Sequence, residues 1–170
     1  MHYNIIEKDQ YEDLSYVKKL SFGCGKNYLI IKEELPYIRL EIGTDNPFDT
    51  ACIFRNYLCI GAYDKVIFVD LDTLKSHSMK IEMYFGYFDI LNNWLFVSSG
   101  VGITALDENL NVVWQRNDLA VDGVIINRVT EDKKYLEVSC ELDPPGDWHT
   151  KWIDIHTGEE TERERYNGTF

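Results

Sequence analysis

Basic residues are scarce in this sequence of 170 residues, because only 17 Lys and Arg stand against 29 Asp and Glu, a formal net charge of −12. Binding to nucleic acid or to an anionic membrane surface relies on clustered Lys and Arg, so we expect no nucleic acid and no membrane partner. Such acidity fits a basic protein partner, and it also fits solubility alone.

Long apolar runs and paired cysteines are missing too. No segment approaches the ~20 apolar residues of a membrane helix, and the N-terminus lacks the basic and apolar regions of a secretory signal. The four cysteines, Cys24, Cys52, Cys59 and Cys140, show no Cys-x-x-Cys spacing, and we expect reduced thiols. The sequence therefore predicts a cytoplasmic protein, and its length fits one domain over residues 1–170.

Motifs of familiar catalytic and cofactor sites are also absent. The stretch from Gly23 to Lys26 lacks the glycine spacing of a phosphate-binding loop, and Asn27 stands where Ser or Thr would follow. Ser98-Ser99-Gly100 lacks the context of a nucleophile elbow, and the His and Asp residues do not fall at metal-ligand spacing. We therefore expect a protein that is not an enzyme and that carries no cofactor and no metal.

The sequence does contain a repeat with a period of about 40 residues from Phe48 onward. An aromatic-Leu pair opens a strand three times, and each time an apolar strand follows that ends in aspartate. The pairs are Tyr57-Leu58, Trp94-Leu95 and Tyr135-Leu136, and the aspartates are Asp70, Asp107 and Asp154. The Leu-to-Asp interval is 12, 12 and 18 residues, so the third copy carries six extra residues.

Each repeat divides into four short predicted strands. In the first they are Ala51–Arg55, Tyr57–Ala62, Lys65–Leu71 and Ser78–Met83; in the second Phe88–Leu91, Trp94–Ser98, Gly102–Leu106 and Val112–Arg116; in the third Gly123–Val129, Tyr135–Glu141, Thr150–Ile155 and Glu160–Arg165. Four strands per unit at this period are typical of propeller blades. The predicted fold class is all-β, with antiparallel four-stranded repeat units in a partial or degenerate propeller-like arrangement, or else an open sheet or sandwich.

The turn after each repeated aspartate has a physical interpretation. Its carboxylate can accept hydrogen bonds from backbone N–H groups further into the turn. Four residues later we expect a positive φ, at Leu74, Asn111 and Gly158. Asn and Gly tolerate this conformation and Leu does not, so the first repeat is expected to turn differently.

The segment from Gly102 to Trp114 resembles the blade repeat of quinoprotein-like β-propellers (the PQQ type), which have a Gly-x-x-x-Ala-Leu-Asp…Gly-x-x-x-Trp pattern. Asn111 stands for the second glycine of that pattern, and the two degenerate copies have His77 and Thr161 in place of Trp114. The resemblance implies a blade and says nothing about the quinone cofactor, which most such repeats do not bind.

The number of repeats leaves the closure of the fold open. The predicted segments are an N-terminal 1–47, with strands at Tyr28–Ile31 and Tyr37–Ile42 and a short amphipathic helix between Tyr11 and Leu20, and repeats over 48–86, 87–121 and 122–166. The N-terminal segment could supply a fourth blade, the sheet could stay open, or two chains could combine. Over 160–165, Glu on one face alternates with Thr161 and two Arg on the other, so the segment has no apolar face, which favours an exposed, protected edge strand.

The six extra residues of the third repeat mark the candidate binding site. Insertions into repeat units usually emerge as loops on one face, often the binding face, and tryptophan is a frequent interface anchor. The candidate residues are Asp143, Asp147, Trp148, His149 and Trp152. The alternative is that Trp152 belongs to the core and Trp148 is only its strand neighbour.

These observations predict a non-catalytic protein-binding domain. By general type, a small, acidic, bacterial-looking domain without motifs resembles the immunity proteins of toxin systems, whose acidic surface would steer onto a basic partner. Two alternatives remain: a small-ligand or carbohydrate-binding module that uses Trp148 and Trp152, and an enzyme with an unfamiliar site.

Overall fold

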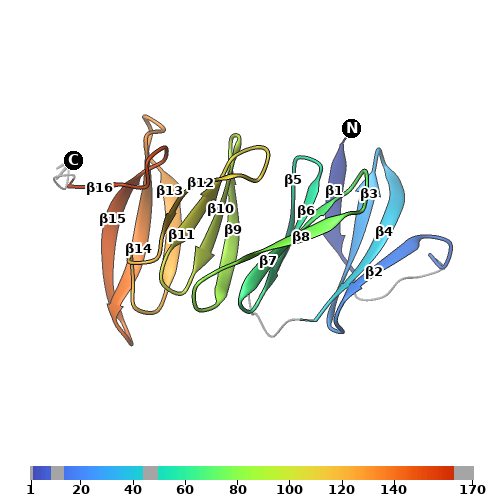
Figure 1. The fold of residues 1–170 in the computed structure, drawn as a ribbon, viewed down its shortest axis with the longest axis horizontal. Coiled ribbons are helices and arrows are strands. Elements are labelled where there is room, and N and C mark those ends of the chain that lie inside the picture. Colours follow the sequence, from blue (N-terminus) through green and yellow to red (C-terminus); the bar gives the residue numbers. More distant parts are fainter. Residues whose placement is uncertain (1, 9–13, 44–49, 163–170) are drawn as a thin grey trace, which may run out of the picture. The chain divides into compact units, whose positions relative to one another are not determined.

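The computed structural model describes residues 2–8, 14–43 and 50–162, and every regular element in these ranges is a β-strand (Figure 1). The strands form four sheets of four strands each. The all-β fold built from four-stranded units is therefore confirmed. In the described ranges no helix is long and apolar enough to cross a membrane.

The first sheet is formed by the N-terminal segment and has the order β1-β3-β4-β2. Its strands are β1 (Tyr3–Glu7), β2 (Lys18–Phe22), β3 (Lys26–Lys32) and β4 (Leu35–Ile42). The segment thus supplies a fourth four-stranded sheet. In this sheet β2 pairs with β4 in parallel, whereas the other two pairs are antiparallel, as in the repeat units.

The amphipathic helix expected between Tyr11 and Leu20 is also wrong for the described part of that segment, since Lys18–Phe22 is a strand (Tyr11 itself lies outside the described residues). The reason is tertiary. In β2 the apolar side chains alternate, and Leu20 lies opposite Leu40 in the parallel pair. Leu20 and Phe22 pack against the core of the first unit. A strand places both side chains on the core side, and the helical spacing of the apolar residues in the sequence does not show this.

The three repeats form sheets in which sequential strands are antiparallel neighbours. They are β5 (Ala51–Phe54), β6 (Tyr57–Ala62), β7 (Lys65–Asp70) and β8 (Ser76–Lys80); β9 (Phe85–Leu91), β10 (Trp94–Ser99), β11 (Ile103–Leu106) and β12 (Val112–Arg116); and β13 (Val124–Val129), β14 (Tyr135–Asp143), β15 (Asp147–Asp154) and β16 (Glu160–Thr161). Of the predicted edge strand, residues 163–165 lie outside the described residues, as do Phe48 and Asp49.

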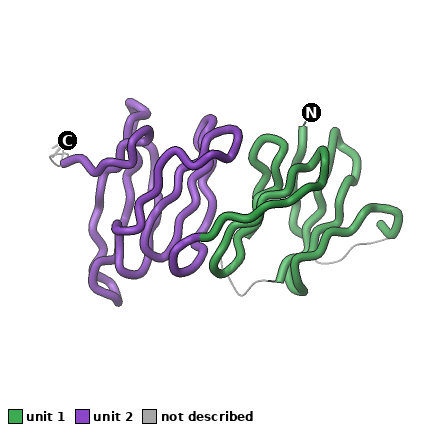
Figure 2. Tube along the Cα trace, viewed as in Figure 1, with its two compact units in different colours: residues 1–80 green, residues 81–170 purple. Residues whose placement is uncertain are grey.

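The chain divides into two compact units, residues 1–80 and 81–170, each with two of the sheets (Figure 2). In the first unit, buried side chains of β3 and β4 such as Ile30 and Leu40 pack with Leu58 and Val69 of the next sheet. In the second unit, Phe96 and Trp114 pack with Val138 and other side chains of the last sheet. Each unit therefore has its own core, and the predicted single-domain organisation and repeat boundaries stay a prediction.

The three repeated aspartates cap their turns as expected. Oδ1 of Asp70 accepts the Asp72 and Thr73 amides at 2.9 and 2.8 Å. Oδ1 of Asp154 accepts two amides at 2.8 and 3.0 Å in the same way. Oδ1 of Asp107 accepts the amides of Asn109 and Asn111, both at 2.8 Å. The repetition of aspartate therefore reflects turn geometry.

The prediction of which turn is unusual was wrong. Leu74 does adopt a positive φ of 59°, like Gly158 at 73°, and both amides donate to the carbonyl of the aspartate four residues earlier. In the second repeat the positive φ falls on Leu110, three residues after Asp107. The best sequence match to the blade pattern thus has the shorter turn.

A β-bulge compensates for the shorter turn. Asp70 N–H donates to the carbonyl five residues on, whereas Asp107 N–H donates four residues on. In the second repeat the register then shifts between Ala105 and Leu106, so that Val113 is the extra residue and Trp114 still lies opposite Ala105. His77 opposite Phe68 and Thr161 opposite Trp152 occupy the equivalent positions, which confirms the alignment predicted for Trp114.

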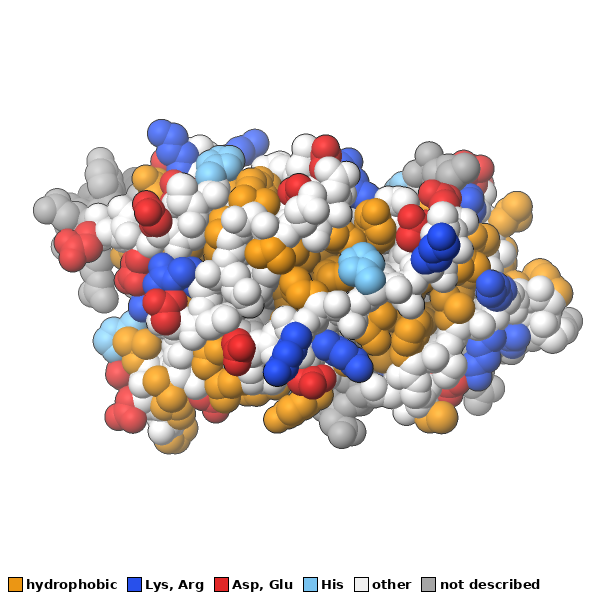
Figure 3. Space-filling model, viewed as in Figure 1, with side chains coloured by type: hydrophobic (Ala, Val, Ile, Leu, Met, Phe, Trp, Pro, Cys, Tyr) orange, Lys and Arg blue, Asp and Glu red, His pale blue; other side chains and the backbone are white. Residues whose placement is uncertain are grey.

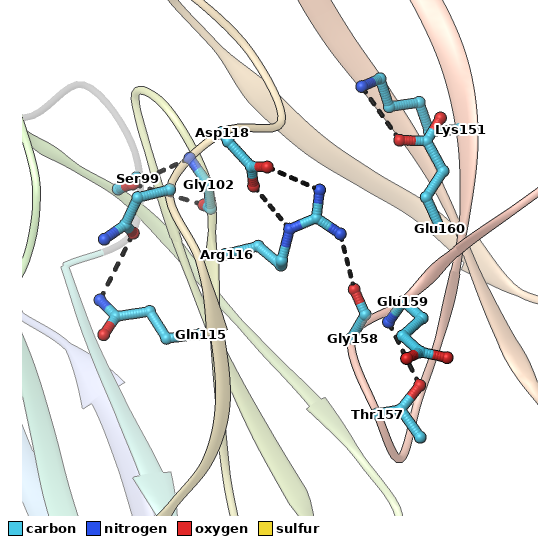
Figure 4. A network of polar contacts seen from close by, with 11 residues as sticks. Ser99, Gly102, Gln115, Arg116, Asp118, Lys151, Thr157, Gly158, Glu159 and Glu160 are labelled. Carbon is cyan, nitrogen blue, oxygen red and sulfur yellow. Dashed lines mark hydrogen bonds and ion pairs between the residues drawn. The ribbon is translucent and has the colours of Figure 1, made fainter.

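Trp114 and Arg116 of β12 connect the third sheet to the turn between β15 and β16. The Trp114 indole N–H donates to the Ile155 carbonyl at 2.7 Å, and its ring lies against Gly158, where an added Cβ would be 2.7 Å from the ring. Arg116 lies between the Asp118 carboxylate and the Gly158 carbonyl, which it reaches at 3.0 Å (Figure 4). These contacts hold the β15–β16 turn, which follows the candidate site in the sequence.

Candidate functional site

The six extra residues of the third repeat lengthen a β-hairpin and do not form an irregular loop. Trp148 pairs with Glu141 and Asp147 with Asp143, and only residues 144–146 form the turn (Figure 1). The Glu141 carboxylate accepts the backbone N–H of Gly146, which ties the turn back to the strand. The expectation of a loop was wrong because the alternating pattern from Trp148 to Trp152 extends strand pairing to the insertion itself.

The hairpin has two distinct faces. One face of β13–β15 packs into the core of the second unit, with Val124, Val138 and Ile153. We call the other face the tryptophan face; in register order across the three strands it carries Gly123, Glu141 and Trp148, then Ile125, Ser139 and Thr150, then Arg128, Glu137 and Trp152. Trp148 and Trp152 therefore share a face, as side chains four residues apart on one strand must.

The other predicted site residues are distributed differently. His149 lies on the opposite face, since it is paired with the buried Cys140, and its Nε2 is 2.9 Å from Asp147 Oδ1. Asp143 and Asp147 pair with each other at the end of the hairpin. The structure thus brings the two tryptophans together on one face and leaves His149 off it.

Trp148 is exposed but held in place. Its side chain is 45% exposed, and its ring contacts Gly123, where an added Cβ would be 2.9 Å from Cη2. Gly123 has a φ of +124°, a conformation that L side chains rarely adopt. The backbone therefore leaves open the space that the indole occupies.

Two apolar residues near Trp148 were not among the predicted site residues. Ile125 is 42% exposed on the tryptophan face, and Val121 is 55% exposed, with its N–H bonded to the Glu141 carbonyl at 2.8 Å. The sequence did not indicate that Ile125 is exposed, because it lies within the continuous apolar run Val124-Ile125-Ile126. Ile125 therefore shares the tryptophan face with Trp148, and Val121 is bonded to the backbone of Glu141, the register partner of Trp148.

Carboxylates lie near Trp148 in the hairpin and just before β13. Glu141 lies beside Trp148 on the tryptophan face, and Asp143 and Asp147 follow at the hairpin end. Asp122 precedes Gly123 and accepts a hydrogen bond from the Tyr84 hydroxyl. The one arginine of the face, Arg128, is paired with Glu137 at 2.7 Å. On the molecular face drawn in Figure 3, basic side chains are interspersed with acidic ones.

A partly buried carboxyl group, that of Asp89, lies elsewhere in the second unit, on β9. Asp89 pairs with Phe96 of β10, and its Oδ2 is buried without a hydrogen-bond partner among the described residues. This burial raises the pKa of Asp89 to about 6. Nearby, burial raises the pKa of Tyr87 to about 12, and the Tyr87 hydroxyl bonds the Ile126 amide.

We expect Asp89→Asn to stabilise the protein at pH 8 by about 1–2 kcal/mol, a value reduced for the partial exposure of the carboxyl. Because the folded-state pKa is raised, wild-type stability is lost as the pH rises from about 4 through about 6. The gain in the variant should therefore vanish near pH 4. Urea denaturation at several pH values measures it, with the exposed Asp64→Asn as control. A gain equal at pH 4 and pH 8 would contradict the assignment.

Among the described residues no group of three or more His, Cys, Asp or Glu is arranged to hold a metal ion. All four cysteines are free, and Cys140 is fully buried in the core of the second unit, where burial raises the pKa of its thiol to about 11.

Comparison with known proteins identifies the fold. No known protein family matches the sequence, and no curated protein does. Among solved structures, BamB from Moraxella catarrhalis, a quinoprotein-like β-propeller, is similar over 93% of this chain and 50% of its own, with a TM-score of 0.54 and 16% identity. Hydrazine synthase from Kuenenia stuttgartiensis is similar over 90% of this chain and 52% of its own, with a TM-score of 0.52 and 14% identity.

The chain thus spans about half the length of the solved structures that it matches. At this level of identity the similarity concerns the fold alone. With four-stranded sheets, a blade-type turn after each repeated aspartate and these structural neighbours, the chain has a β-propeller-like fold.

Proposed function

We propose that this chain is a non-catalytic protein-binding domain and that the tryptophan face is its contact surface. The observation that carries the proposal is Trp148, a large aromatic side chain that is 45% exposed on a regular strand and fixed against Gly123. An exposed tryptophan that is already ordered loses little conformational entropy on binding, which is a property of interface anchors.

The surroundings of Trp148 favour a partner that offers positive charge around an apolar centre. Ile125 and Val121 are further exposed apolar side chains of this region, and Glu141, Asp143 and Asp147 lie in the same hairpin as Trp148. Together with the net charge of −12, this arrangement would steer a basic protein surface toward the hairpin. An inhibitor or immunity-type protein that covers a basic partner is the specific role that we propose.

The β-propeller-like fold is compatible with this role but does not select it, because one fold carries many functions. The geometry of the hairpin supports the proposed binding role more directly than the fold does. In the hairpin, strand pairing continues to the last residue pair, so the candidate contact residues belong to a sheet and need no loop to become ordered on binding.

One observation favours a second candidate, carbohydrate or small-ligand binding. Trp148 and Trp152 share a face, and their Cα atoms are separated by four residues of strand, about 13 Å. Two sugar rings could stack on such a pair. However, Trp152 is less exposed than Trp148, and Thr150 lies between them.

We expect Trp148→Ala to weaken capture of the partner at least tenfold, since a central aromatic anchor typically contributes about 2 kcal/mol or more. The protein is immobilised and exposed to an extract of the organism that encodes it, at low and at high salt. The control is Tyr63→Ala, which removes another exposed aromatic side chain, 79% exposed in the first unit.

The outcomes separate the candidates. A partner that is retained by the wild type and by Tyr63→Ala, lost with Trp148→Ala and weakened at high salt supports the proposal. A partner that binds both variants equally places the interface elsewhere. If no protein is retained and an oligosaccharide array binds in a manner that depends on both Trp148 and Trp152, the carbohydrate function replaces the proposed one.

A further inference from the structure

Two thiols of the first unit lie directly opposite each other. Cys52 of β5 and Cys59 of β6 are register partners in an antiparallel hairpin whose last pair is Phe54 and Tyr57. Partners across an antiparallel pair point to the same side of the sheet. The two sulfur atoms are therefore brought together by the fold, although seven positions separate the residues in the sequence.

The backbone spacing at this pair suits a disulfide. Gly61 N–H donates to Thr50 O at 2.7 Å, two residues beyond the Cys52–Cys59 pair. Because hydrogen-bonded pairs alternate along an antiparallel ladder, the cysteines belong to the same set, whose Cα atoms are about 5.5 Å apart. Disulfides span Cα separations of about 4.4–6.8 Å, so the Cα spacing allows a bridge. The Cβ atoms must approach each other by about 1 Å, because register partners hold them about 4.5–5.5 Å apart and a disulfide needs about 3.5–4.5 Å.

The two thiols differ in access. Cys52 is half-buried on the edge strand β5, whereas Cys59 is fully buried on β6. Burial, together with the neighbouring Cys52, raises the pKa of the Cys59 thiol well above its ordinary value. An oxidant from solution therefore reacts with Cys52 first. The buried Cys59 then reacts only with the modified Cys52.

We propose that Cys52 and Cys59 form a reversible disulfide in the folded protein, with a low-molecular-weight disulfide such as oxidised glutathione as the oxidant. The Cys52 thiolate attacks one glutathione sulfur, forms a mixed disulfide and releases one glutathione thiolate, which takes up a proton. Cys59 then loses its proton and attacks the Cys52 sulfur, which releases the second glutathione. Two protein thiols are oxidised, one glutathione disulfide is reduced, and two glutathione thiols are formed.

The remaining cysteines provide internal controls. Cys24 is exposed and Cys140 is buried, and Cys140 lies opposite Val124 and His149, not opposite a thiol. Neither has a register partner that could resolve a mixed disulfide. The proposed bridge lies in the first unit and is independent of the function proposed for the tryptophan face.

The test uses the full folded chain. It is treated with oxidised glutathione, quenched with acid, alkylated and digested with trypsin, which cleaves after Arg55, between the two cysteines. The expected product is a pair of disulfide-linked peptides that contain Cys52 and Cys59, and dithiothreitol should separate them. Cys52 recovered as an alkylated thiol, or as a persistent glutathione adduct, would overturn the proposal.

Variants test the order of events. Cys59→Ala should leave a stable glutathione adduct on Cys52, whereas Cys52→Ala should leave Cys59 reduced. The control Cys24→Ser should bridge like the wild type. Loss of the bridge in Cys24→Ser, or rapid glutathionylation of Cys59 in Cys52→Ala, would contradict the proposed sequence. If a core variant fails to fold, as circular dichroism would show, the wild-type peptide map decides the outcome alone.

Discussion

Replacing Trp114 by alanine is expected to lower the free energy of unfolding of the second unit by about 3–5 kcal/mol. The side chain is only 8% exposed and packs on Phe96, with ring centroids 6.0 Å apart. Its removal leaves a cavity between β12 and the β15–β16 turn. It also leaves the Ile155 carbonyl without the indole N–H that it accepts at 2.7 Å, which adds a desolvation cost.

The equivalent register position in the first unit provides the matched control. His77 lies opposite Phe68 as Trp114 lies opposite Ala105, but His77 is exposed and contacts Phe68 at a ring distance of 5.2 Å. His77→Ala should cost less than about 1 kcal/mol. Urea denaturation, combined with hydrogen exchange to locate the loss, measures both. A Trp114→Ala effect no larger than that of His77→Ala would refute the assigned role.

The architecture of the repeats could be predicted because its signals are local. The aromatic-Leu pairs and the repeated aspartates recur along the chain, and each aspartate caps its turn through main-chain hydrogen bonds a few residues away. The position of Trp114 could also be predicted, because the same offset from aspartate leads to His77 and Thr161. Its contact with Gly158 joins two different repeats, so no pattern within one repeat could reveal it.

Errors arose where tertiary contacts decide the outcome. The strand β2 pairs in parallel with β4, and no sequence feature within Lys18–Phe22 indicates a parallel partner. Leu74 adopts a left-handed φ that its side chain disfavours, and it is partly buried against the core of the first unit. In each case packing overrides local preference.

For the candidate site, the alternation of side chains along β15 explains why Trp148 and Trp152 share a face and His149 does not, although the sequence analysis grouped all three. The sequence could not identify the contact of Trp148 with Gly123, because Gly123 immediately precedes β13 and Trp148 lies on β15, two strands that are not neighbours in the sheet order. Nor could it show that Ile125 is exposed, since the core side of β13 is fixed only by the sheet packed against it.

Gly102→Ala is expected to cost about 3 kcal/mol or more, at the upper end of the range for overpacking. Gly102 ends the short turn between β10 and β11, where Ser99 N–H donates to its carbonyl at 2.8 Å and its own N–H donates to Ser99 Oγ at 3.1 Å (Figure 4). An added Cβ would lie only 1.7 Å from the Arg116 carbonyl oxygen. Backbone from two strands meets here, and no side-chain rotation relieves the contact.

The control for this substitution is Gly86→Ala in the same sheet. There the nearest atom to an added Cβ is the Ser98 carbonyl oxygen at 3.2 Å, and a shift of a few tenths of an ångström accommodates it. Its stability should stay within about 1 kcal/mol of the wild type, because alanine also reduces the entropy of the unfolded chain. Comparable urea midpoints for the two variants would show that β12 can move away from Gly102. A selective loss in Gly102→Ala would show that the first glycine of the blade pattern is required by the close approach of two backbones, a requirement independent of any ligand.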